Sequence, residues 1–176
     1  NYLLDEITAK LLSIRNIDRK YIESFLEPSI KNLIPNPSCL KDMEKTTTRI
    51  FKAIKNKENI GIFGDYDVDG ASSTALLGNY FKMINQNFEI YIPDRKSEGY
   101  GPSIKSFKKL FEKKVDLIIT VDCGTLSFDA IEFANKNKID VIVLDHHQSE
   151  VKLPNAYSII NPNRLDDNSN LKYLCA

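Results

Sequence analysis

The stretch that decides the fold is IGIFGDYDVDG, residues 60–70. Its first five residues are apolar or glycine, which is typical of a short strand buried in a sheet. The strand gives way to three aspartates at alternate positions and then to a glycine. Residues 71–85 continue with helix-compatible side chains, so the stretch predicts a strand that passes through an acidic turn into a helix.

The same alternation of strand and helix continues through most of the chain. We expect strands near 60–64, 88–92, 117–121, 141–144 and 157–160, and helices near 71–85, 103–113 and 127–137. Strands that alternate with helices of this length favour βαβ units. The sequence therefore predicts an α/β fold, with a Rossmann-like, mostly parallel sheet and flanking helices.

A short helical segment is expected to precede this domain. Apolar residues follow a helical period in 7–14 and again in 21–26, and a further helix is predicted over 43–55. Three residues of that last helix are expected to face inward: Ile50, Phe51 and Ile54. We expect a boundary near residue 57, between a helical leader (1–57) and the α/β domain (58–176).

The composition is typical of a soluble globular protein. Of 176 residues, 42% are hydrophobic and 27% are charged, which suits one α/β domain with a buried core. No apolar run approaches the ~20 residues that a membrane-spanning helix needs. The three cysteines are widely spaced and form no CxxC pair, so neither a disulfide framework nor a zinc knuckle is indicated, and a cytoplasmic location is expected.

The charge balance argues against one mode of nucleic-acid binding. The 24 basic and 24 acidic residues give a formal net charge of zero, whereas a domain that holds nucleic acid mainly by neutralising phosphates is usually basic. Bound metal could still supply positive charge locally.

The acidic turn is the first candidate site. Alternate residues of an extended segment point the same way, so Asp65, Asp67 and Asp69 are expected to crowd one face. Their mutual repulsion would raise a pKa among them unless a cation neutralised the charges. Gly70 allows a tight turn into the next helix, whose N-terminus, with Ser72 in its first turn, offers backbone N–H groups to a phosphate.

Three other interpretations of this turn stay open. The aspartates could be solvated turn residues. An EF-hand loop has the pattern D-x-[DN]-x-[DN]-G with a glutamate at position twelve, but that position, counted from Asp65, is Leu76, and a strand is expected before the turn. An Asp-x-Asp phosphatase that forms an aspartyl phosphate would use Asp65 and Asp67 but would leave the histidines without a role.

Two further strand ends carry the same kinds of side chain. The strand at 117–121 stops at Asp122, and the strand at 141–144 stops at Asp145-His146-His147, which holds the only two histidines of the chain. The carboxyl ends of parallel strands share one edge of a sheet, where ligands bind. Carboxylate and imidazole suit hard and borderline divalent metals. The sequence thus predicts a metal-dependent phosphoesterase, with turn residues and structural histidines as the simpler alternative.

The loop at 93–102 is a weaker candidate for substrate binding. Gly99 and Gly101 allow a backbone to approach closely, and Arg95 could hold a phosphate through two hydrogen bonds. Glycine–proline loops are common, so this signal has low specificity. Five lysines on the following helix are expected to form a solvated face, with DNA contact as the alternative: Lys105, Lys108, Lys109, Lys113 and Lys114.

Five motifs together resemble the DHH phosphoesterase superfamily, which is named for the motif found here at 145–147. They are GDYDVDGASS (64–73), PDRKSEGYGPS (93–103), TVDCG (120–124), LDHH (144–147) and IINPN (159–163). They follow the superfamily's order, and residues 11–28 resemble the leader helices of its RecJ branch, the exonucleases specific for single-stranded DNA.

The resemblance implies a metal centre. It implies catalytic metal, typically Mn²⁺ at two sites with Mg²⁺ as an alternative, bound by Asp67, Asp69, Asp122 and His146. Asp65 is implied to be a further ligand or to lie just behind the ligands, as in RecJ; many smaller members instead have a histidine at the position of Phe63. The substrate phosphate is implied to be held by Arg95, with Gly99, Gly101 and Ser72 as further contacts. His147 is implied to be catalytic and to face either the metal or the scissile phosphate.

The function implied by the resemblance is hydrolysis of single-stranded DNA from the 5′ end by a metal-activated water, in DNA repair and recombination. Alternatives are hydrolysis of short RNA, cyclic dinucleotides or pyrophosphate, and a scaffold without catalysis. The superfamily completes its metal site with a later aspartate, and RecJ adds DHHA1 and OB domains, whose motifs do not occur in this sequence. We therefore expect a fragment of a longer enzyme, which need not be active alone, and a single-strand-binding protein or helicase as partner through other regions.

Overall fold

The computed structural model describes residues 4–175, and the chain divides into two compact units, 1–36 and 37–176. The first unit holds α1 (Glu6–Ile14), the 3-10 helix η1 (Arg19–Tyr21), α2 (Ile22–Leu26) and α3 (Ile30–Leu33). The Asp5 carboxylate caps α1 by accepting from the backbone N–H of Thr8 at 2.9 Å. Leu12 is the only buried side chain among residues 4–36. The expected helices before the α/β domain are therefore confirmed, with very little core of their own.

The second unit is built on a five-stranded parallel sheet. Its strands are β1 (Ile60–Gly64), β2 (Phe88–Tyr91), β3 (Leu117–Val121), β4 (Asp140–Leu144) and β5 (Ser158–Ile160), in the order β2-β1-β3-β4-β5. All residues of β1 and β3 are buried, as expected for central strands covered on both faces. The predicted α/β fold is confirmed.

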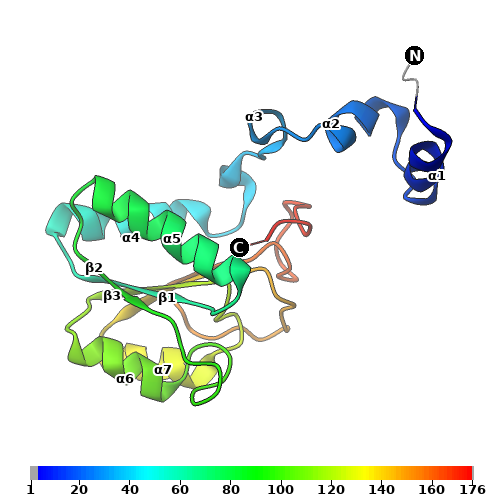
Figure 1. Ribbon diagram of the computed structural model, residues 1–176. Coiled ribbons are helices and arrows are strands. Elements are labelled where there is room, and N and C mark those ends of the chain that lie inside the picture. The colour runs from blue at the N-terminus through cyan, green and yellow to red at the C-terminus, as the bar shows by residue number, and fades with distance from the viewer. Residues whose placement is uncertain (1–3, 176) are drawn as a thin grey trace. The chain divides into compact units, whose positions relative to one another are not determined.

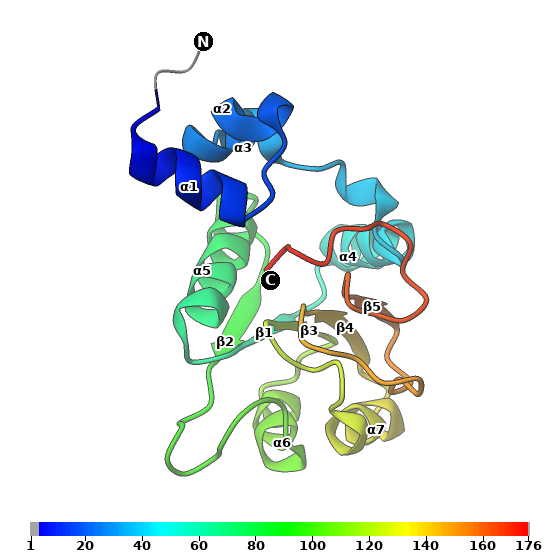
Figure 2. The same ribbon diagram turned by 90° about the vertical axis from the view of Figure 1, so that its right-hand side faces the viewer.

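Helices cover both faces of the sheet. After the 3-10 helix η2 (Pro37–Cys39), α4 (Met43–Asn56) and α5 (Val68–Met83) lie on one face, and α6 (Ile104–Glu112) and α7 (Phe128–Lys136) lie on the other (Figures 1 and 2). Ala53 and Phe81 join the core on the first side, and Phe107 and Ile131 join it on the second. Among the helices of residues 4–175, none has both the length and the apolar character that crossing a bilayer requires.

The two compact units divide earlier in the chain than the domain boundary that we expected near residue 57, because α4 packs with the α/β unit. Ala53 is fully buried against the sheet. The buried Arg49 guanidinium of α4 pairs with Glu58 at 2.7 Å and with Asp140 of β4 at 2.6 Å. These contacts tie α4 to the sheet, so the division between the units falls after Asn36.

Two local details also differ from the expectation. Phe51 was expected to face inward but is 69% exposed, because each residue turns a helix by about 100° and the adjacent Ile50 packs toward the core. The helix expected from residue 71 begins at Val68, because the Asp67 carboxylate caps it by accepting from the Gly70 N–H at 3.0 Å.

The strand order creates a crevice at the carboxyl edge of the sheet. From β1 the chain moves to β2 on one side, and it then crosses to β3 on the other side of β1. The connecting helices α5 and α6 consequently lie on opposite faces (Figure 1). The loops that follow β1 and β3 therefore diverge, and open α/β sheets bind their ligands at such a switch point.

Candidate metal centre

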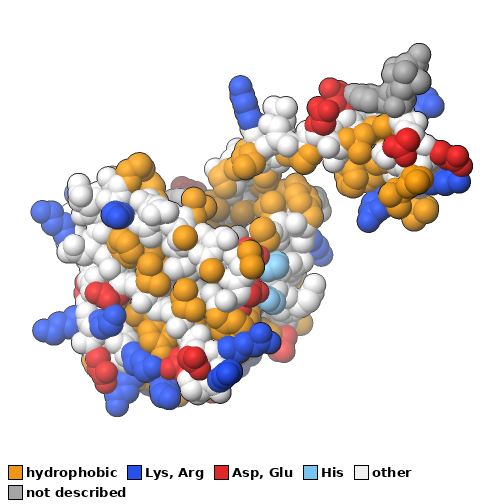
Figure 3. Space-filling model, in the orientation of Figure 1, with side chains coloured by type: hydrophobic (Ala, Val, Ile, Leu, Met, Phe, Trp, Pro, Cys, Tyr) orange, Lys and Arg blue, Asp and Glu red, His pale blue; other side chains and the backbone are white. Residues whose placement is uncertain are grey.

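Acidic and imidazole side chains from three strand ends meet at this edge. Asp65 follows β1, Asp122 follows β3, and His146 lies two residues after β4. His146 Nε2 lies 3.1 Å from Asp122 Oδ1 and 3.6 Å from Asp69 Oδ2. Figure 3 shows the histidine side chains at the surface of the α/β unit, next to acidic side chains. The structure thus brings together the strand-end residues that the sequence separates.

Two sets of potential metal ligands adjoin each other among residues 4–175. One set is Asp65, Asp67 and Asp122, and the other is Asp122, His146 and His147; within each set, one ligand atom per residue lies within 4.8 Å of the others. Because the sets share Asp122, its two oxygens could serve two neighbouring cations. Two-metal hydrolases use such an arrangement, with the ions roughly 3.5–4 Å apart.

The turn after β3 has an unusual backbone that holds Asp122 in place. Asp122 has a φ of 61°, in the left-handed region that few residues other than glycine adopt. Its N–H donates to the carbonyl of Leu144 at 2.9 Å. Gly124 has a φ of 111°, and a Cβ there would lie 2.6 Å from Thr120 Oγ1. The turn therefore requires glycine at 124, and it carries the kind of backbone strain that clusters at functional sites.

The central carboxylates are buried without hydrogen bonds of good geometry. Asp65 and Asp122 are 3% and 1% exposed. Among the described residues, Asp65 Oδ1 and both oxygens of Asp122 have no hydrogen-bond partner of good geometry, although His146 Nε2 lies 3.1 Å from Asp122 Oδ1. Burial raises the pKa of Asp65. Burial, with the negative charges of Asp69 and Asp67, raises the pKa of Asp122 to about 6. Buried carboxylate oxygens that lack such hydrogen bonds are suited to a divalent cation, so these residues fit a metal.

Asp145, the first residue of the histidine motif, has the opposite environment. Its Oδ1 accepts from the backbone N–H of His146 at 2.8 Å, the N–H of His147 at 3.2 Å and His147 Nδ1 at 2.8 Å, and its Oδ2 accepts from the Thr125 N–H at 3.0 Å. Burial alone would raise the pKa of Asp145, but the hydrogen bonds from Thr125 and His147 lower it. Asp145 therefore organises the turn rather than offering oxygens to a metal.

The His147 ring is held from two sides. Besides its contact with Asp145, its Nδ1 and Nε2 lie 3.2 and 3.3 Å from the hydroxyl of Tyr100, which also donates to the Asp122 carbonyl at 3.2 Å. Burial alone would lower the pKa of His147, but the hydrogen bond with Asp145 and the charges of nearby carboxylates raise it. The side chain remains 48% exposed, so it is oriented and still within reach of a ligand.

Comparison with known proteins agrees with this geometry. A model of the DHH family, N-terminal domain, matches residues 59–175. The chain belongs to the DHH family. Among curated relatives of this DHH-family chain, the single-stranded-DNA-specific exonuclease RecJ of Bacillus subtilis is 38% identical over 72% of the chain, and that of Haemophilus influenzae is 37% identical over 78%. The chain spans only 16% and 24% of their lengths.

Solved structures support the same assignment. An exonuclease RecJ bound to manganese superposes on 73% of the chain with a TM-score of 0.67 and 30% identity, over 33% of its own length. RecJ of Thermus thermophilus in complex with Mn²⁺ covers 92% of the chain with a TM-score of 0.70. At 24% identity, that second likeness concerns the fold alone.

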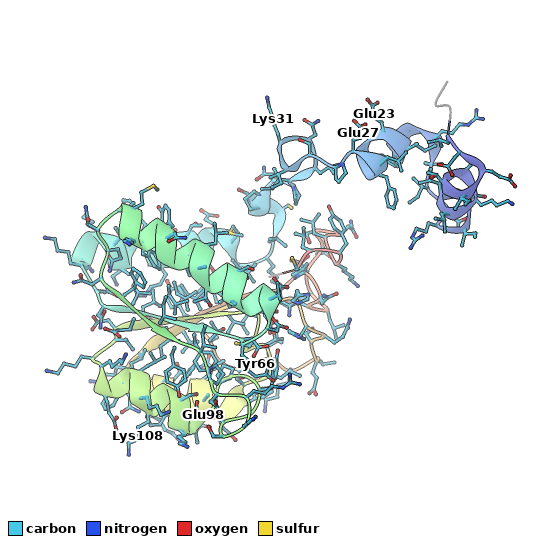
Figure 4. The ribbon with its side chains drawn as sticks, in the orientation of Figure 1. Glu23, Glu27, Lys31, Tyr66, Glu98 and Lys108 are labelled. Carbon is cyan, nitrogen blue, oxygen red and sulfur yellow. The ribbon has the colours of Figure 1, made fainter. Side chains whose placement is uncertain are left out.

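The loop that carries Arg95 is tied to the sheet of this DHH-family chain. The Arg95 guanidinium lies 5.3 Å from the ring centre of Tyr66, in the loop after β1. The Glu98 carboxylate accepts from the Tyr91 hydroxyl at 2.5 Å and from Lys109 Nζ at 2.5 Å. Figure 4 labels Tyr66 and Glu98 in these two loops. The loop is thereby anchored at Glu98, and Arg95 is placed next to the acidic turn.

The other expected phosphate contacts are less constrained. Gly99 and Gly101 have φ of 79° and 73°, and no described atom lies within 4 Å of a Cβ at either. Glycine is therefore favoured at both positions by the backbone conformation and not by close packing. Ser72 is exposed on α5. Phosphate binding by these three residues stays a prediction. Lys113, just after α6, pairs with a glutamate of β2 at 2.6 Å, and Lys108 of α6 points away from the sheet (Figure 4).

The EF-hand interpretation of the acidic turn is wrong. A strand, β1, precedes the turn, where an EF-hand has a helix. Position twelve is occupied by Leu76, which is 75% exposed on α5 and carries no oxygen.

Several residues that shape the site received no role from the sequence. They are Tyr100, Thr125, Asn161 and Asn163, which bond to the histidine turn or to its neighbours. All lie in or next to the five motifs, so the signal was present. Their partners are 14 to 47 residues away in the chain, and only the fold reveals those contacts.

Proposed function

We propose that this crevice binds Mn²⁺ and that the protein hydrolyses phosphodiester bonds of single-stranded DNA from the 5′ end, using a metal-activated water. The observation that carries the proposal is the pair of donor sets that share Asp122, whose buried oxygens have no hydrogen bond of good geometry among the described residues. Burial of such carboxylates without a cation would destabilise the folded protein, because an unpaired charge is costly to remove from water.

The proposed ligands are Asp67, Asp69, Asp122 and His146, with Asp65 as a further ligand or a group just behind them. This mixture of carboxylate and imidazole suits Mn²⁺, with Mg²⁺ as the second choice. The RecJ structure bound to manganese, at 30% identity, supports that order. When bound, such a metal lowers the pKa of water from ~15.7 toward ~7 and so provides hydroxide at neutral pH.

The chain's own residues would bind and neutralise the substrate phosphate. Asp145 engages Nδ1 of His147, so Nε2, 3.3 Å from the Tyr100 hydroxyl, is the ring nitrogen that would turn to a phosphate. A protonated imidazole would donate a charge-assisted hydrogen bond from it. Arg95, next to the acidic turn, would hold a second oxygen. Donors fixed before the reaction stabilise the charge that develops on the phosphate oxygens.

The substrate is proposed from the relatives. The RecJ proteins that share 37–38% identity with this chain are described as specific for single-stranded DNA. All the ligands that the superfamily pattern places within this span are present, which favours an enzyme over a scaffold without catalysis. The formal net charge of zero supports local binding of the phosphate rather than a broad basic groove.

The test combines a binding measurement with an activity measurement. Mn²⁺ is titrated into the protein by calorimetry, and Mn²⁺-dependent nucleotide release from 5′-labelled single strands is measured with the full-length protein. We expect Asp69→Asn and His146→Gln to weaken both by more than the roughly 10–100-fold that loss of an outer-shell group costs. Glu150→Gln, which removes an exposed loop carboxylate, should leave both unchanged.

Each alternative predicts a different outcome. A scaffold would show no tight Mn²⁺ site. Faster turnover of short RNA, cyclic dinucleotides or pyrophosphate than of single-stranded DNA would assign another substrate. Unchanged nucleotide release by Asp69→Asn or His146→Gln would show that the proposed centre is not the site of reaction.

A further inference from the structure

We propose that Asn161, which follows β5, is a positioning residue that fixes the orientation and tautomer of the His147 ring. The proposal deepens the proposed function, because it assumes that His147 faces the substrate phosphate. Asn161 belongs to the IINPN motif (159–163), which contains none of the proposed metal ligands. A closed set of hydrogen bonds that includes Asn161 joins the ends of β3, β4 and β5.

The Asn161 side chain has all its polar atoms engaged. It is 1% exposed. Its Nδ2 donates to Thr125 Oγ1 at 2.8 Å and to the His147 carbonyl at 2.9 Å, and its Oδ1 accepts from the Asn163 N–H at 2.8 Å. A buried amide with both donors and its acceptor satisfied has one allowed orientation. Asn161 therefore fixes the positions of the Thr125 hydroxyl and the His147 carbonyl, to which it donates.

The two residues to which Asn161 donates, Thr125 and His147, both also bond to the Asp145 carboxylate. The Thr125 N–H donates to Asp145 Oδ2 at 3.0 Å, and Asp145 Oδ1 accepts from His147 Nδ1 at 2.8 Å. The hydrogen bonds thus run from Asn161 through Thr125 and Asp145 to the His147 ring, and return to Asn161 through the His147 carbonyl. With Asp145 as acceptor, Nδ1 must carry the proton. Nε2, which lies 3.3 Å from the Tyr100 hydroxyl, is then the ring nitrogen that could turn to the substrate.

This network is distinct from the proposed metal ligands. The side chain of Asn161 bonds to Thr125, to the backbone carbonyl of His147 and to Asn163. Among the described residues, these bonds reach the two donor sets only through that carbonyl. The carbonyl of His146, the expected ligand, is instead held by Asn163 Nδ2. Loss of the Asn161 donors should therefore affect turnover much more than metal affinity.

The sharpest readout is the nitrogen spectrum of the two histidine rings. Because the chain has only two histidines, long-range ¹H–¹⁵N correlation spectra of the metal-free protein hold two imidazole spin systems, and His146→Gln assigns them. Above the pKa of the ring, unrestrained neutral imidazole favours the Nε2–H tautomer, whereas the structure requires Nδ1–H at His147. This measurement does not depend on catalysis.

The test variant is Asn161→Asp, which keeps shape and the acceptor for Asn163 but removes both donors. The matched control is Asn155→Asp, the same chemical change on an exposed loop. We expect wild type and control to show Nδ1–H at His147, and Asn161→Asp to shift toward Nε2–H. We also expect kcat of the full-length protein on single-stranded DNA to fall roughly 10–100-fold, with the calorimetric affinity for Mn²⁺ retained.

Each outcome separates this inference from the proposed function. An unchanged His147 tautomer in a folded Asn161→Asp variant overturns the inference even if the wild type proves to be an exonuclease. A tautomer shift together with an inactive wild type sustains the network and overturns the function. If Asn161→Asp does not fold, Thr125→Val removes the hydroxyl that Asn161 binds and keeps the N–H to Asp145; an unchanged His147 spectrum there also overturns the inference.

Discussion

Replacement of Asp122 by asparagine should stabilise the metal-free protein while abolishing its response to Mn²⁺. The side chain is buried next to Asp67 and Asp69, and its oxygens have no hydrogen bond of good geometry among the described residues, so folding disfavours the ionised carboxylate. Its pKa rises from 3.8 to about 6. At about 1.36 kcal/mol per pKa unit, the ionised form lowers the free energy of unfolding by up to about 3 kcal/mol. An amide avoids that cost and can donate to the neighbouring Asp67 and Asp69.

The pH dependence gives the prediction a definite sign. Because the pKa of Asp122 is higher in the folded than in the unfolded protein, the folded protein binds the proton more tightly. The tighter binding of the proton stabilises the folded wild type below pH 4, and this stabilisation is lost as pH rises through about 6. The stability difference between Asp122→Asn and wild type should therefore be near zero at pH 4 and largest above pH 6.

Thermal unfolding at pH 7.5 and at pH 4, in EDTA and in excess Mn²⁺, measures both effects. In EDTA at pH 7.5, Asp122→Asn should melt higher than wild type, by about 2–4 °C per kcal/mol. Mn²⁺ at 100 times its dissociation constant should stabilise wild type by about 2.7 kcal/mol and leave the variant unchanged. Glu150→Gln is the control for loss of one exposed carboxylate. A variant that is less stable than wild type in EDTA at pH 7.5 would refute the reasoning.

Two further predictions concern the loops around the site. Gly124→Ala should lower the free energy of unfolding by about 1–3 kcal/mol, because the φ of 111° and the 2.6 Å approach to Thr120 Oγ1 exclude a side chain; an unchanged denaturation midpoint in urea would contradict this. Glu98→Gln should raise KM for single-stranded DNA more than it lowers kcat and leave Mn²⁺ affinity unchanged, because it weakens the charge-assisted bonds from Lys109 and Tyr91 that anchor the Arg95 loop. Glu112→Gln, which changes an exposed carboxylate of α6, is its control, and a loss confined to kcat would argue against an anchoring role.

The sequence was sufficient to predict most elements but not how they are arranged. Each strand is a short apolar run bounded by turn residues, so local composition identifies all five. The order β2-β1-β3-β4-β5 depends on the side of β1 to which each crossover returns, which no local pattern encodes. The boundary after Asn36 likewise depends on tertiary contacts of α4, such as the ion pairs of Arg49.

The candidate site shows the same limit at the level of single residues. The alternation of Asp65, Asp67 and Asp69 and the pair of histidines indicate metal chemistry because residue type and spacing carry that signal. The role of Asp145 depends instead on the Thr125 N–H, 20 residues earlier in the chain. Whether a carboxylate has donors is a property of the fold, so sequence alone could not distinguish Asp145 from Asp122.

That distinction has a consequence for how the centre works. Asp65, Asp122 and Asp145 are all buried, at 3%, 1% and 5% exposure, so burial does not separate them. Asp145 accepts four hydrogen bonds and its pKa is lowered, so it is ionised by the protein alone. Asp122 has no hydrogen bond of good geometry among the described residues, with His146 Nε2 3.1 Å away, and its pKa is raised, so a cation would make its charge favourable. The hydrogen bonds of the histidine turn therefore do not depend on metal, whereas Asp65 and Asp122 would be stabilised by it, and mutations at the two places should be separable by chelation.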